Sequence, residues 1–335
     1  MPTPGRLTAR RPALGPEELA SRFRPPRRFA HARFGTYEPN PAHPSQAAAR
    51  AVMESFVDEV VASSPPPRRR WAPARPETDR TAPGRYVHGA FGVGKTHLLA
   101  AAWHAAPFPK AYLTFAELTA VIGFLGMEGA AGAFSGYRLL CIDEFEPDDA
   151  ATAATVVTFL RAVVPMGVRV AVTSQALPAG SRDATLAAIA SWFDVVRVDG
   201  PDYARSFSST TALSPAEASE LLARAGGAAT DDGFGDVLAH LRRLQPVQLG
   251  PLVDGVETVV VRDVVATPDE GAALAWAALV DEMYDHQVTF GMTGCDVGGV
   301  FDGRYRQGAY RATYARCERR LAAMLGEAHA RLSSP

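Results

Sequence analysis

Residues 89–96 have the composition of a loop that binds phosphate groups. They read Gly-Ala-Phe-Gly-Val-Gly-Lys-Thr, which matches the pattern G-x-x-x-x-G-K-[ST] at every fixed position. The glycines let backbone N–H groups turn toward a polyphosphate, Lys95 can reach the β- and γ-phosphates, and the Thr96 hydroxyl can ligate Mg²⁺. The motif predicts nucleotide contacts from a run of consecutive residues: Gly89, Ala90, Phe91, Gly92, Val93, Gly94, Lys95, Thr96 and His97.

The flanks of this loop support the prediction. Residues 85–88 are typical of a short strand, and residues 97–103 are typical of a helix. A phosphate bound by the loop would therefore lie at a helix N-terminus, where free N–H groups and the helix dipole favour anions. The alternative is a glycine-rich turn that matches the pattern by chance, and a second motif farther along the chain argues against it.

That second motif is Leu-Leu-Cys-Ile-Asp-Glu at residues 139–144. A continuous apolar run that ends in two acids indicates a buried parallel strand with carboxylates at its C-terminal edge, where open α/β sheets bind ligands. We expect Asp143 to hold Mg²⁺, directly or through water, and Glu144 to orient or deprotonate an attacking water. Alone, this pattern marks only the end of a strand. Together, the two motifs predict an enzyme that hydrolyses ATP with Mg²⁺ as cofactor.

The composition is that of an ordinary soluble protein, large enough for one or two domains. The chain has 335 residues, 47% hydrophobic and 21% charged, and its net charge of -2 provides no general attraction to nucleic acid or anionic membranes. It contains no run of about 18 apolar residues of the kind that spans a membrane. Its cysteines, Cys141, Cys295 and Cys317, show neither metal-ligand nor disulfide spacing, which suits the reducing cytoplasm.

Changes in composition divide the chain into segments. Residues 1–30 are rich in arginine and are expected to form a basic, disordered arm that can also contact an acidic partner or lipid headgroups. Residues 31–62 form an N-terminal helical segment, and residues 63–84 form a linker rich in proline and arginine. The inward positions expected in this helix are Ala47, Val52, Phe56, Val60 and Val61. The nucleotide-binding core is expected at residues 85–200, followed by a helix-rich C-terminal region at residues 201–335.

Strand and helix patterns alternate through the core. Besides the strands already named, residues 111–115, 168–173 and 193–198 are short and apolar, and helices are expected between them, one of them with Pro147 in its first turn. This alternation predicts an α/β fold in which helices flank a parallel sheet.

The C-terminal region combines helices with isolated strands. The capping patterns at residues 214–217 and 267–270 predict two helix starts, and a last helix is expected over about residues 308–332. Strands are expected at residues 256–262 and 288–292. This region is therefore predicted to be α+β and rich in helices.

Several stretches of the chain resemble one family of proteins. Residues 89–99 resemble its extended Gly-x-Phe-Gly-x-Gly-Lys-Thr-His-Leu-Leu, and residues 139–145 resemble its Leu-Leu-Cys-x-Asp-Glu-Phe. The other matching segments are Phe34-Gly35-x-Tyr37, Pro44-Ser45-Gln46, Asp199-Gly200-x-Asp202-Tyr203 and Leu279-Val280-Asp281-x-x-Tyr284-Asp285. The family is that of the ZapE-type ATPases of the AAA superclass, bacterial cell-division proteins with mitochondrial relatives. The resemblance covers about residues 29–325.

This resemblance implies a P-loop fold of the AAA type and a homo-oligomer that binds ATP between the phosphate loop and a neighbouring subunit. It implies in-line attack of water on the γ-phosphate, with Lys95, Mg²⁺ and an arginine stabilising the charge. Hydrolysis would drive conformational work on a protein client, the tubulin-like cell-division ring protein FtsZ, in the cytoplasm near the inner membrane. A peripheral membrane contact is compatible with this location, whereas nucleic acid is not an expected partner.

The chain departs from the family at positions that bear on catalysis. Gln175 stands where the family usually has Asn, although its amide can also position a water or touch the γ-phosphate. Arg205 follows Asp202-Tyr203 one residue later than the family's arginine, and Arg205 and Arg182 are the candidates for an arginine that acts on a neighbouring subunit. Arg320 corresponds to a family arginine and is a candidate nucleotide-sensing residue, with a surface or core-edge role as the alternative.

Two other functions fit parts of the sequence. A replication-initiator or helicase-loader ATPase shares the Gly-Lys-Thr-His-Leu-Leu run, but it predicts a basic, helix-turn-helix-like terminal domain that the C-terminal region does not show. An ATP-binding switch or adaptor with negligible turnover would account for Gln175 and the displaced Arg205. Turnover measurements separate the switch from the ATPase, and DNA binding with a steep dependence on salt would favour the initiator.

Overall fold

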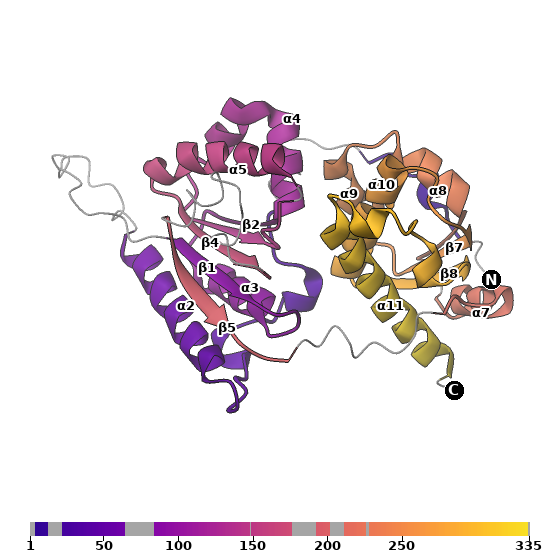
Figure 1. The fold of residues 1–335 in the computed structure, drawn as a ribbon, viewed down its shortest axis with the longest axis horizontal. Coiled ribbons are helices and arrows are strands. Elements are labelled where there is room, and N and C mark those ends of the chain that lie inside the picture. The colour runs from indigo at the N-terminus through magenta and orange to yellow at the C-terminus, as the bar shows by residue number, and fades with distance from the viewer. Residues whose placement is uncertain are drawn as a thin grey trace. The chain divides into compact units, whose positions relative to one another are not determined.

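The computed structural model describes residues 4–12, 22–63, 84–147, 149–175, 192–201, 211–225 and 228–333. The chain folds into two compact units (Figure 1). The phosphate-loop unit comprises Ser21–Pro25 and Phe29–Tyr203, and the C-terminal unit comprises Met1–Ala20, Pro26–Arg28 and Ala204–Pro335. The first part of the chain therefore contributes to both units.

The phosphate-loop unit is built on a parallel sheet. Its five strands have the order β2-β3-β4-β1-β5, and every neighbouring pair runs parallel. They are β1 (Gly84–Gly89), β2 (Lys110–Thr114), β3 (Leu139–Asp143), β4 (Arg169–Ser174) and β5 (Phe193–Val198). Each lies where the sequence predicts a strand. Strand β3 is buried along its whole length, as expected for an apolar run covered on both faces.

Helices flank this sheet on both faces, α2 and α3 on one and α4 and α5 on the other (Figure 1). They are α2 (Pro44–Ala62), α3 (Lys95–Ala105), α4 (Phe115–Phe134) and α5 (Ala150–Val163), with short 3-10 helices at η3 (Phe34–Thr36) and η4 (Val164–Met166). A further 3-10 helix, η2 (Arg27–Phe29), includes residues of both units. Helix α5 begins later than Pro147 suggests because Asp149 caps it, accepting the N–H of Thr152 at 2.8 Å. The predicted α/β fold with a flanked parallel sheet is confirmed.

Helix α4 is unusually apolar. Among the described residues it is the one helix whose length and composition would allow it to cross a membrane. Its side chains Leu118, Val121 and Phe134 are nevertheless buried, and the ring of Phe134 packs edge-on against Phe159 of α5 with centroids 5.5 Å apart. The helix joins the neighbouring strands β2 and β3 and packs against both, so it covers one face of the sheet.

Helix α2 packs against α3 and the edge strand β5. Met53 and Val60 belong to the apolar core on this side of the sheet. The prediction that Val52 and Val61 point inward is wrong, because these residues are 37% and 51% exposed. Ala47 is exposed as well, whereas the predicted inward residues Phe56 and Val60 are buried, so the prediction is right for part of the inward stripe.

The C-terminal unit has its own core around a second parallel sheet, of order β6-β7-β8. Its elements are η1 (Leu7–Ala9), α7 (Pro215–Arg224), β6 (Ala229–Gly233), α8 (Phe234–Leu241), η7 (Pro246–Gln248), α9 (Leu249–Val253), β7 (Thr258–Val264), α10 (Glu270–Asp285), β8 (Thr289–Gly294), η8 (Val297–Gly299), η9 (Tyr305–Gln307) and α11 (Arg311–Ser333). Trp276 of α10 is fully buried and its ring contacts Phe234 and Phe290. The predicted helix-rich C-terminal region is confirmed.

Two helix starts in this unit test the capping predictions. Before α7, the Ser214 hydroxyl accepts the N–H of Glu217 at 3.2 Å and the Glu217 carboxylate accepts the N–H of Ser214 at 2.8 Å, which is the predicted capping box. The predicted start at Thr267 is wrong, since α10 begins at Glu270 with Asp269 as its cap. Thr267 is buried and donates its N–H to the carbonyl of Val300 at 2.9 Å instead.

Residues 4–12 are part of the C-terminal unit, so the prediction of a disordered arm is wrong for them. Gly5 forms a parallel bridge with Thr230 of β6, and Leu7 is only 1% exposed. Strand β6 is also unexpected, because it reads Ala-Thr-Asp-Asp-Gly and aspartate is depleted in strands. Its aspartates have partners in the fold: Arg262 donates to Asp231 at 2.7 Å, and Asp232 accepts hydrogen bonds from residues 7 and 8.

Candidate nucleotide-binding and catalytic site

The phosphate loop joins β1 to α3 and needs glycine at defined positions. Gly94 has a φ of 93°, and a Cβ added there would lie 2.5 Å from the Tyr37 ring. A Cβ added at Gly89 would lie 2.0 Å from the carbonyl oxygen of Val198 on β5. Glycine is therefore required at Gly94 by backbone conformation and at both positions by close packing.

Lys95 begins α3 and turns its amino group back toward the start of the loop. Its Nζ donates to the carbonyl oxygens of Gly89 at 2.8 Å and Ala90 at 2.7 Å. Because an ammonium group has three donors, it can exchange such carbonyl partners for phosphate oxygens. The only cation in the motif thus lies inside the loop that would surround a polyphosphate.

The N-terminal helical segment supports the loop from the side. The Tyr37 hydroxyl donates to the carbonyl of Val93 at 3.1 Å, and the rings of Tyr37 and His97 lie 5.6 Å apart. The Nε2 atom of His97 lies 3.1 Å from both the Thr36 hydroxyl and the carbonyl of Arg33. The structure therefore places His97 against η3, and its contact with a nucleotide stays a prediction.

Two of the matching sequence segments meet beside the loop. Gln46 donates its Nε2 to the carbonyl of Asp199 at 2.8 Å, and the Ser45 hydroxyl accepts the N–H of Asp199 at 2.8 Å. A Cβ at Gly200 would lie 2.8 Å from the Val93 side chain, so that glycine also permits close packing against the loop. Two family-like segments outside the loop thus contact each other, and one of them packs against Val93 of the loop.

Asp143 is the centre of a buried polar network at the end of β3. It is 4% exposed, and its Oδ1 lies 3.3 Å from the Thr96 hydroxyl of the phosphate loop. Tyr112 donates to Oδ2 at 2.7 Å, and Thr173 donates to Oδ1. Burial, followed by the charge of Glu144, raises the pKa of Asp143, and the hydrogen bonds from Thr173, Tyr112 and Thr96 act in the opposite direction.

Glu144 follows in a bend that its neighbours enforce. Its φ is 52°, a left-handed value that is uncommon for residues other than glycine and is concentrated at functional sites. Its N–H donates to Asp143 Oδ1 and to the Thr173 hydroxyl, both at 3.1 Å. The N–H of Phe145 donates to the carbonyl of Thr173 at 2.7 Å. Strand β4 therefore holds the acid pair from the side.

The residue of β4 that contacts both acids is Thr173, which sequence reasoning missed. Gln175, the predicted water-positioning residue, is exposed, and its N–H donates to the Glu146 carboxylate at 2.9 Å. Tyr112 was missed as well. Tyr112 lies in the middle of β2 and Thr173 near the end of β4, but their contacts depend on β2 and β4 being the two neighbours of β3, which the sequence alone does not reveal.

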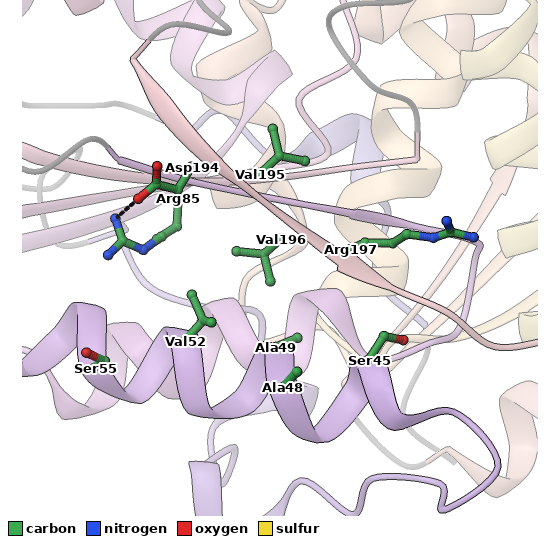
Figure 2. A pocket seen from close by; sticks show the side chains of 10 residues that line it. All are labelled: Ser45, Ala48, Ala49, Val52, Ser55, Arg85, Asp194, Val195, Val196 and Arg197. Atoms are coloured by element: carbon green, nitrogen blue, oxygen red, sulfur yellow. Dashed lines mark ion pairs between the residues drawn. The ribbon is translucent and has the colours of Figure 1, made fainter.

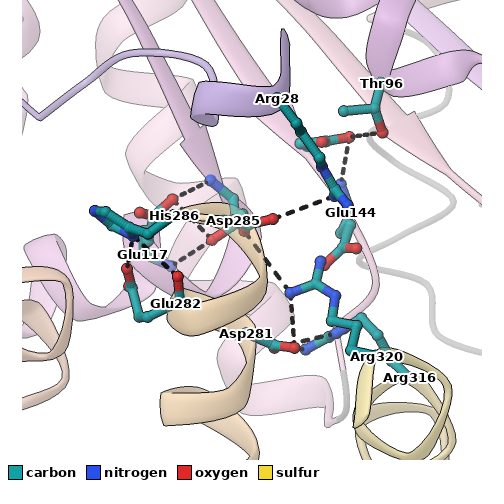
Figure 3. Close-up of polar contacts among 12 residues, drawn as sticks. Arg28, Thr96, Glu117, Glu144, Asp281, Glu282, Asp285, His286, Arg316 and Arg320 are labelled. Atoms are coloured by element: carbon teal, nitrogen blue, oxygen red, sulfur yellow. Dashed lines mark hydrogen bonds and ion pairs between the residues drawn. The ribbon is translucent and has the colours of Figure 1, made fainter. Parts of the chain in front are cut away.

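The predicted arginines fall into two groups. Arg205 and Arg182 lie outside the described residues. Arg320, in α11, is 5% exposed and pairs with Asp281 at 2.7 Å (Figure 3). Its guanidinium lies 5.0 Å from the centre of the Tyr284 ring. This is a core-edge position within the C-terminal unit. A nucleotide-sensing role for Arg320 stays a prediction.

A groove of about 490 Å³ runs between α2 and the edge strand β5 (Figure 2). Val52 and Val195 are partly exposed along it, and Arg85 pairs with Asp194 at 3.2 Å. None of its lining residues belongs to the phosphate loop or to the acid pair. The groove is therefore separate from the candidate catalytic site.

A model of the AFG1-like ATPase family matches residues 25–232, which is more than half of the chain. The chain belongs to the AFG1-like ATPase family. This family includes the ZapE-type ATPases, so the expected resemblance is confirmed, and the protein is a nucleotide-binding ATPase. A search of curated proteins finds no significant match to the sequence.

Solved structures of replication proteins are similar to parts of the chain. A DNA replication initiation factor matches with a TM-score of 0.39 and 13% identity, covering 50% of this chain and 49% of that chain. DnaA from Aquifex aeolicus bound to AMPPCP matches with a TM-score of 0.40 and 12% identity, covering 53% and 54%. The DnaC helicase loader matches with a TM-score of 0.36 and 17% identity, covering 51% and 99%. The chain thus spans about half the length of the first two, and these similarities assign no function to it.

The residues at the loop fit a Mg²⁺ ion bound together with a nucleotide. Mg²⁺ in such sites takes one or two protein oxygens, with phosphate and water completing the shell. Thr96 and Asp143 offer a hydroxyl and a carboxylate 3.3 Å apart. Among the described residues, no group of three or more His, Cys, Asp or Glu side chains gathers to hold a metal by itself. The hydroxyl of Thr96 and the carboxylate of Asp143 therefore suit a metal ion that is bound together with the phosphates of the nucleotide.

Proposed function

We propose that this ATPase uses Mg²⁺ at the phosphate loop, Asp143 and Glu144, and that hydrolysis drives conformational work on a protein client. The observation that carries the proposal is the 3.3 Å approach between the Thr96 hydroxyl and Asp143 Oδ1. It brings together the two motifs, which are 47 residues apart in sequence. A loop for phosphate and a carboxylate for metal at one sheet edge are what phosphoryl transfer to water requires.

Each residue of the site has a separate task in this reaction. Lys95 and the loop amides would orient the phosphates and stabilise their charge. Thr96 and Asp143 would hold Mg²⁺, which supplies charge neutralisation at the phosphate oxygens. Glu144 would orient the attacking water and accept its proton. The Thr173 hydroxyl keeps both acids in position through the hydrogen bonds described above.

The proposed client is the cell-division ring protein FtsZ, approached by a homo-oligomer in the cytoplasm at the inner membrane. The family resemblance supports this choice. The test is cosedimentation with purified FtsZ filaments in the presence of ATP, using Glu144→Gln to retain the nucleotide and Lys95→Ala as the matched variant without it. Greater cosedimentation of Glu144→Gln supports the proposal. The proposal would be contradicted if both variants were found in the pellet in equal amounts, or if neither variant was found there.

A switch with negligible turnover is the second candidate. The observation that favours it is the exposed position of Gln175, whose N–H is bound to Glu146. Steady-state hydrolysis by the wild-type protein, measured with and without FtsZ, decides between the two. If the wild-type protein hydrolyses ATP no faster than Glu144→Gln under both conditions, the protein is an ATP-binding switch. The replication-initiator alternative has no comparable observation in its favour.

A further inference from the structure

His88 is the last side chain of β1 before the phosphate loop. It is half-buried, and it directly precedes Gly89, whose carbonyl oxygen accepts the Lys95 ammonium at 2.8 Å. Its other neighbour, Val87, belongs to the apolar core that α2 and α3 form with this sheet. Because side chains alternate along a strand, His88 lies on the opposite face of the sheet. An ionisable ring is therefore present at the point where β1 turns into the phosphate loop.

The neighbouring strands place one charged pair beside this ring. Arg197 of β5 is the register partner of His88, so both side chains are on the same face of the sheet. Arg197 donates to Asp199, which follows β5, at 2.6 Å, and the Arg197 side chain is 71% exposed. On β4 the register partner of His88 is Ser174, which carries no charge. The charged neighbours of the ring in the sheet are therefore at the end of β5.

The loop itself supplies a further charge. Burial, followed by the positive charge of Arg197, lowers the pKa of His88, and the positive charge of Lys95 acts in the same direction. The negative charge of Asp199 acts in the opposite direction. His88 is therefore neutral in the nucleotide-free protein at neutral pH. Because Lys95 is among the groups that act on His88, the ring senses the charge inside the phosphate loop.

A bound nucleotide reverses the sign of that charge. A polyphosphate carries several negative charges, which outweigh the single positive charge of Lys95. The repulsion between Lys95 and a proton on His88 is then offset, and the phosphates attract that proton instead. The attraction is reciprocal, so a protonated His88 also strengthens the binding of the phosphates.

We propose that His88 takes up a proton when a nucleotide binds the phosphate loop, and that the resulting imidazolium strengthens nucleotide binding. This inference rests on the proposed role of the phosphate loop, and it adds a residue that the sequence motif does not contain. Nucleotide affinity then rises as the pH falls through the pKa of His88 in the bound state. The rise ends below the pKa of His88 in the free state, where both states carry the proton.

The test compares the binding of ADP with Mg²⁺ to the full-length wild-type protein and to His88→Asn at several pH values. ADP is not hydrolysed, and protonation of its own phosphates contributes equally to both proteins. Between about pH 8 and about pH 6, wild-type affinity should rise about threefold or more relative to His88→Asn, because a shift of one pKa unit corresponds to about tenfold in affinity. Calorimetry in two buffers that differ in ionisation enthalpy should show more proton uptake by the wild-type protein than by His88→Asn.

His104→Asn is the matched control. His104 is in the last turn of α3, it is half-buried, and burial lowers its pKa as well. The cations that act on it are Arg33, Lys110 and His31, none of which is in the phosphate loop. This variant should therefore keep the pH dependence of the wild-type protein.

The same pH dependence of ADP affinity in the wild-type protein and in a folded His88→Asn would overturn the proposal, even if the affinity itself changed, because packing would then explain that change. Where His88→Asn does not fold, Arg197→Gln decides. Removing this exposed positive charge should move the rise in affinity to higher pH, and an unmoved curve would overturn the proposal. ADP affinity that Lys95→Ala leaves unchanged would refute the phosphate loop together with this proposal, whereas the other two results leave the loop intact.

Discussion

The phenol of Tyr112 donates a hydrogen bond of 2.7 Å to Oδ2 of Asp143. Both residues are buried, and the other carboxylate oxygen of Asp143 faces the hydroxyls of Thr96 and Thr173. Tyr112 lies on β2 and Asp143 ends β3, its neighbour in the sheet. The phenol therefore fixes which oxygen of Asp143 is turned toward the phosphate loop.

Tyr112→Phe should raise the Mg²⁺ concentration needed for half-maximal ATP hydrolysis. A hydrogen bond to a charged group contributes about 1.5–3 kcal/mol, so we expect a shift of about tenfold or more. Nucleotide affinity without Mg²⁺ should not change, because Lys95 and the loop are untouched. A Mg²⁺ titration of the ATPase measures the shift. The control is Tyr137→Phe, whose ring packs on Phe134 in the same unit, and equal Mg²⁺ curves for the two variants would argue against a positioning role for Tyr112.

Thr173→Val should lower turnover more than Gln175→Ala does. Valine keeps the shape of threonine but loses the hydroxyl that donates to Asp143 and accepts the N–H of Glu144. Loss of a hydrogen bond to a charged group costs about 1.5–3 kcal/mol, which corresponds to a loss of about 10–150-fold if it misplaces the acids. Steady-state turnover at saturating ATP makes the comparison. A larger loss for Gln175→Ala would restore the sequence-based assignment of Gln175 as the water-positioning residue.

Lys95→Ala should abolish tight ATP binding. The ammonium group is the only side-chain cation of the loop, and its contacts to phosphate are worth about 1.5–3 kcal/mol each. Titration with a fluorescent ATP analogue measures the loss. Arg50→Ala is a suitable control, since Arg50 pairs with Glu54 on the surface of α2 at 3.1 Å. Wild-type affinity in the Lys95 variant would refute the phosphate-loop assignment.

Glu144→Gln should bind ATP normally and hydrolyse it about 10²–10⁴-fold more slowly, because an amide keeps the shape of the carboxylate but cannot accept a proton. Asp143→Ala should instead change the Mg²⁺ dependence, so a metal titration separates the two acids. Glu146→Gln is the matched control, as this carboxylate contacts the N–H of Gln175. Turnover of Glu144→Gln within a few-fold of wild type would exclude Glu144 as the base.

The elements of the candidate catalytic site could be predicted because their signals are local. The loop needs its glycines, and β3 is an apolar run that ends in acids, so both follow from residue type and spacing. The partners of the acids could not be predicted in this way. Tyr112 and Thr173 reach Asp143 only because β2 and β4 lie on either side of β3, and this order is a property of the folded sheet.

The same distinction explains the errors in the C-terminal unit. Thr267 stands three residues before Glu270, as a capping residue should, but its N–H donates to the carbonyl of Val300. Asp269 caps α10 instead. Strand β6 is not among the predicted strands, because Asp231 and Asp232 are poor strand residues in isolation. Their partners come from β7 and from residues 4–12. Where long-range contacts satisfy polar residues, local patterns predict the wrong structure.

The final prediction concerns assembly. An arginine supplied by a neighbouring subunit is worth about 10³–10⁵ in rate, so activity that depends on one requires contact between subunits. Arg205 is the first candidate by position, since it closely follows Asp202-Tyr203, and Arg182 is the second. The one-residue shift of Arg205 would turn its side chain to the opposite face of a strand, whereas a loop can absorb it.

We therefore predict that specific ATPase activity rises with protein concentration. We also predict that Arg205→Ala lowers turnover more than it lowers ATP affinity, and that Arg182→Ala lowers turnover less than Arg205→Ala does. Mixing Arg205→Ala with Lys95→Ala subunits tests the arrangement directly, because one variant keeps an intact phosphate loop and the other an intact arginine. Activity should reappear in the mixture if the two groups act across a subunit boundary. Activity that is flat with concentration and unchanged on mixing would indicate a monomeric ATPase or a different arginine.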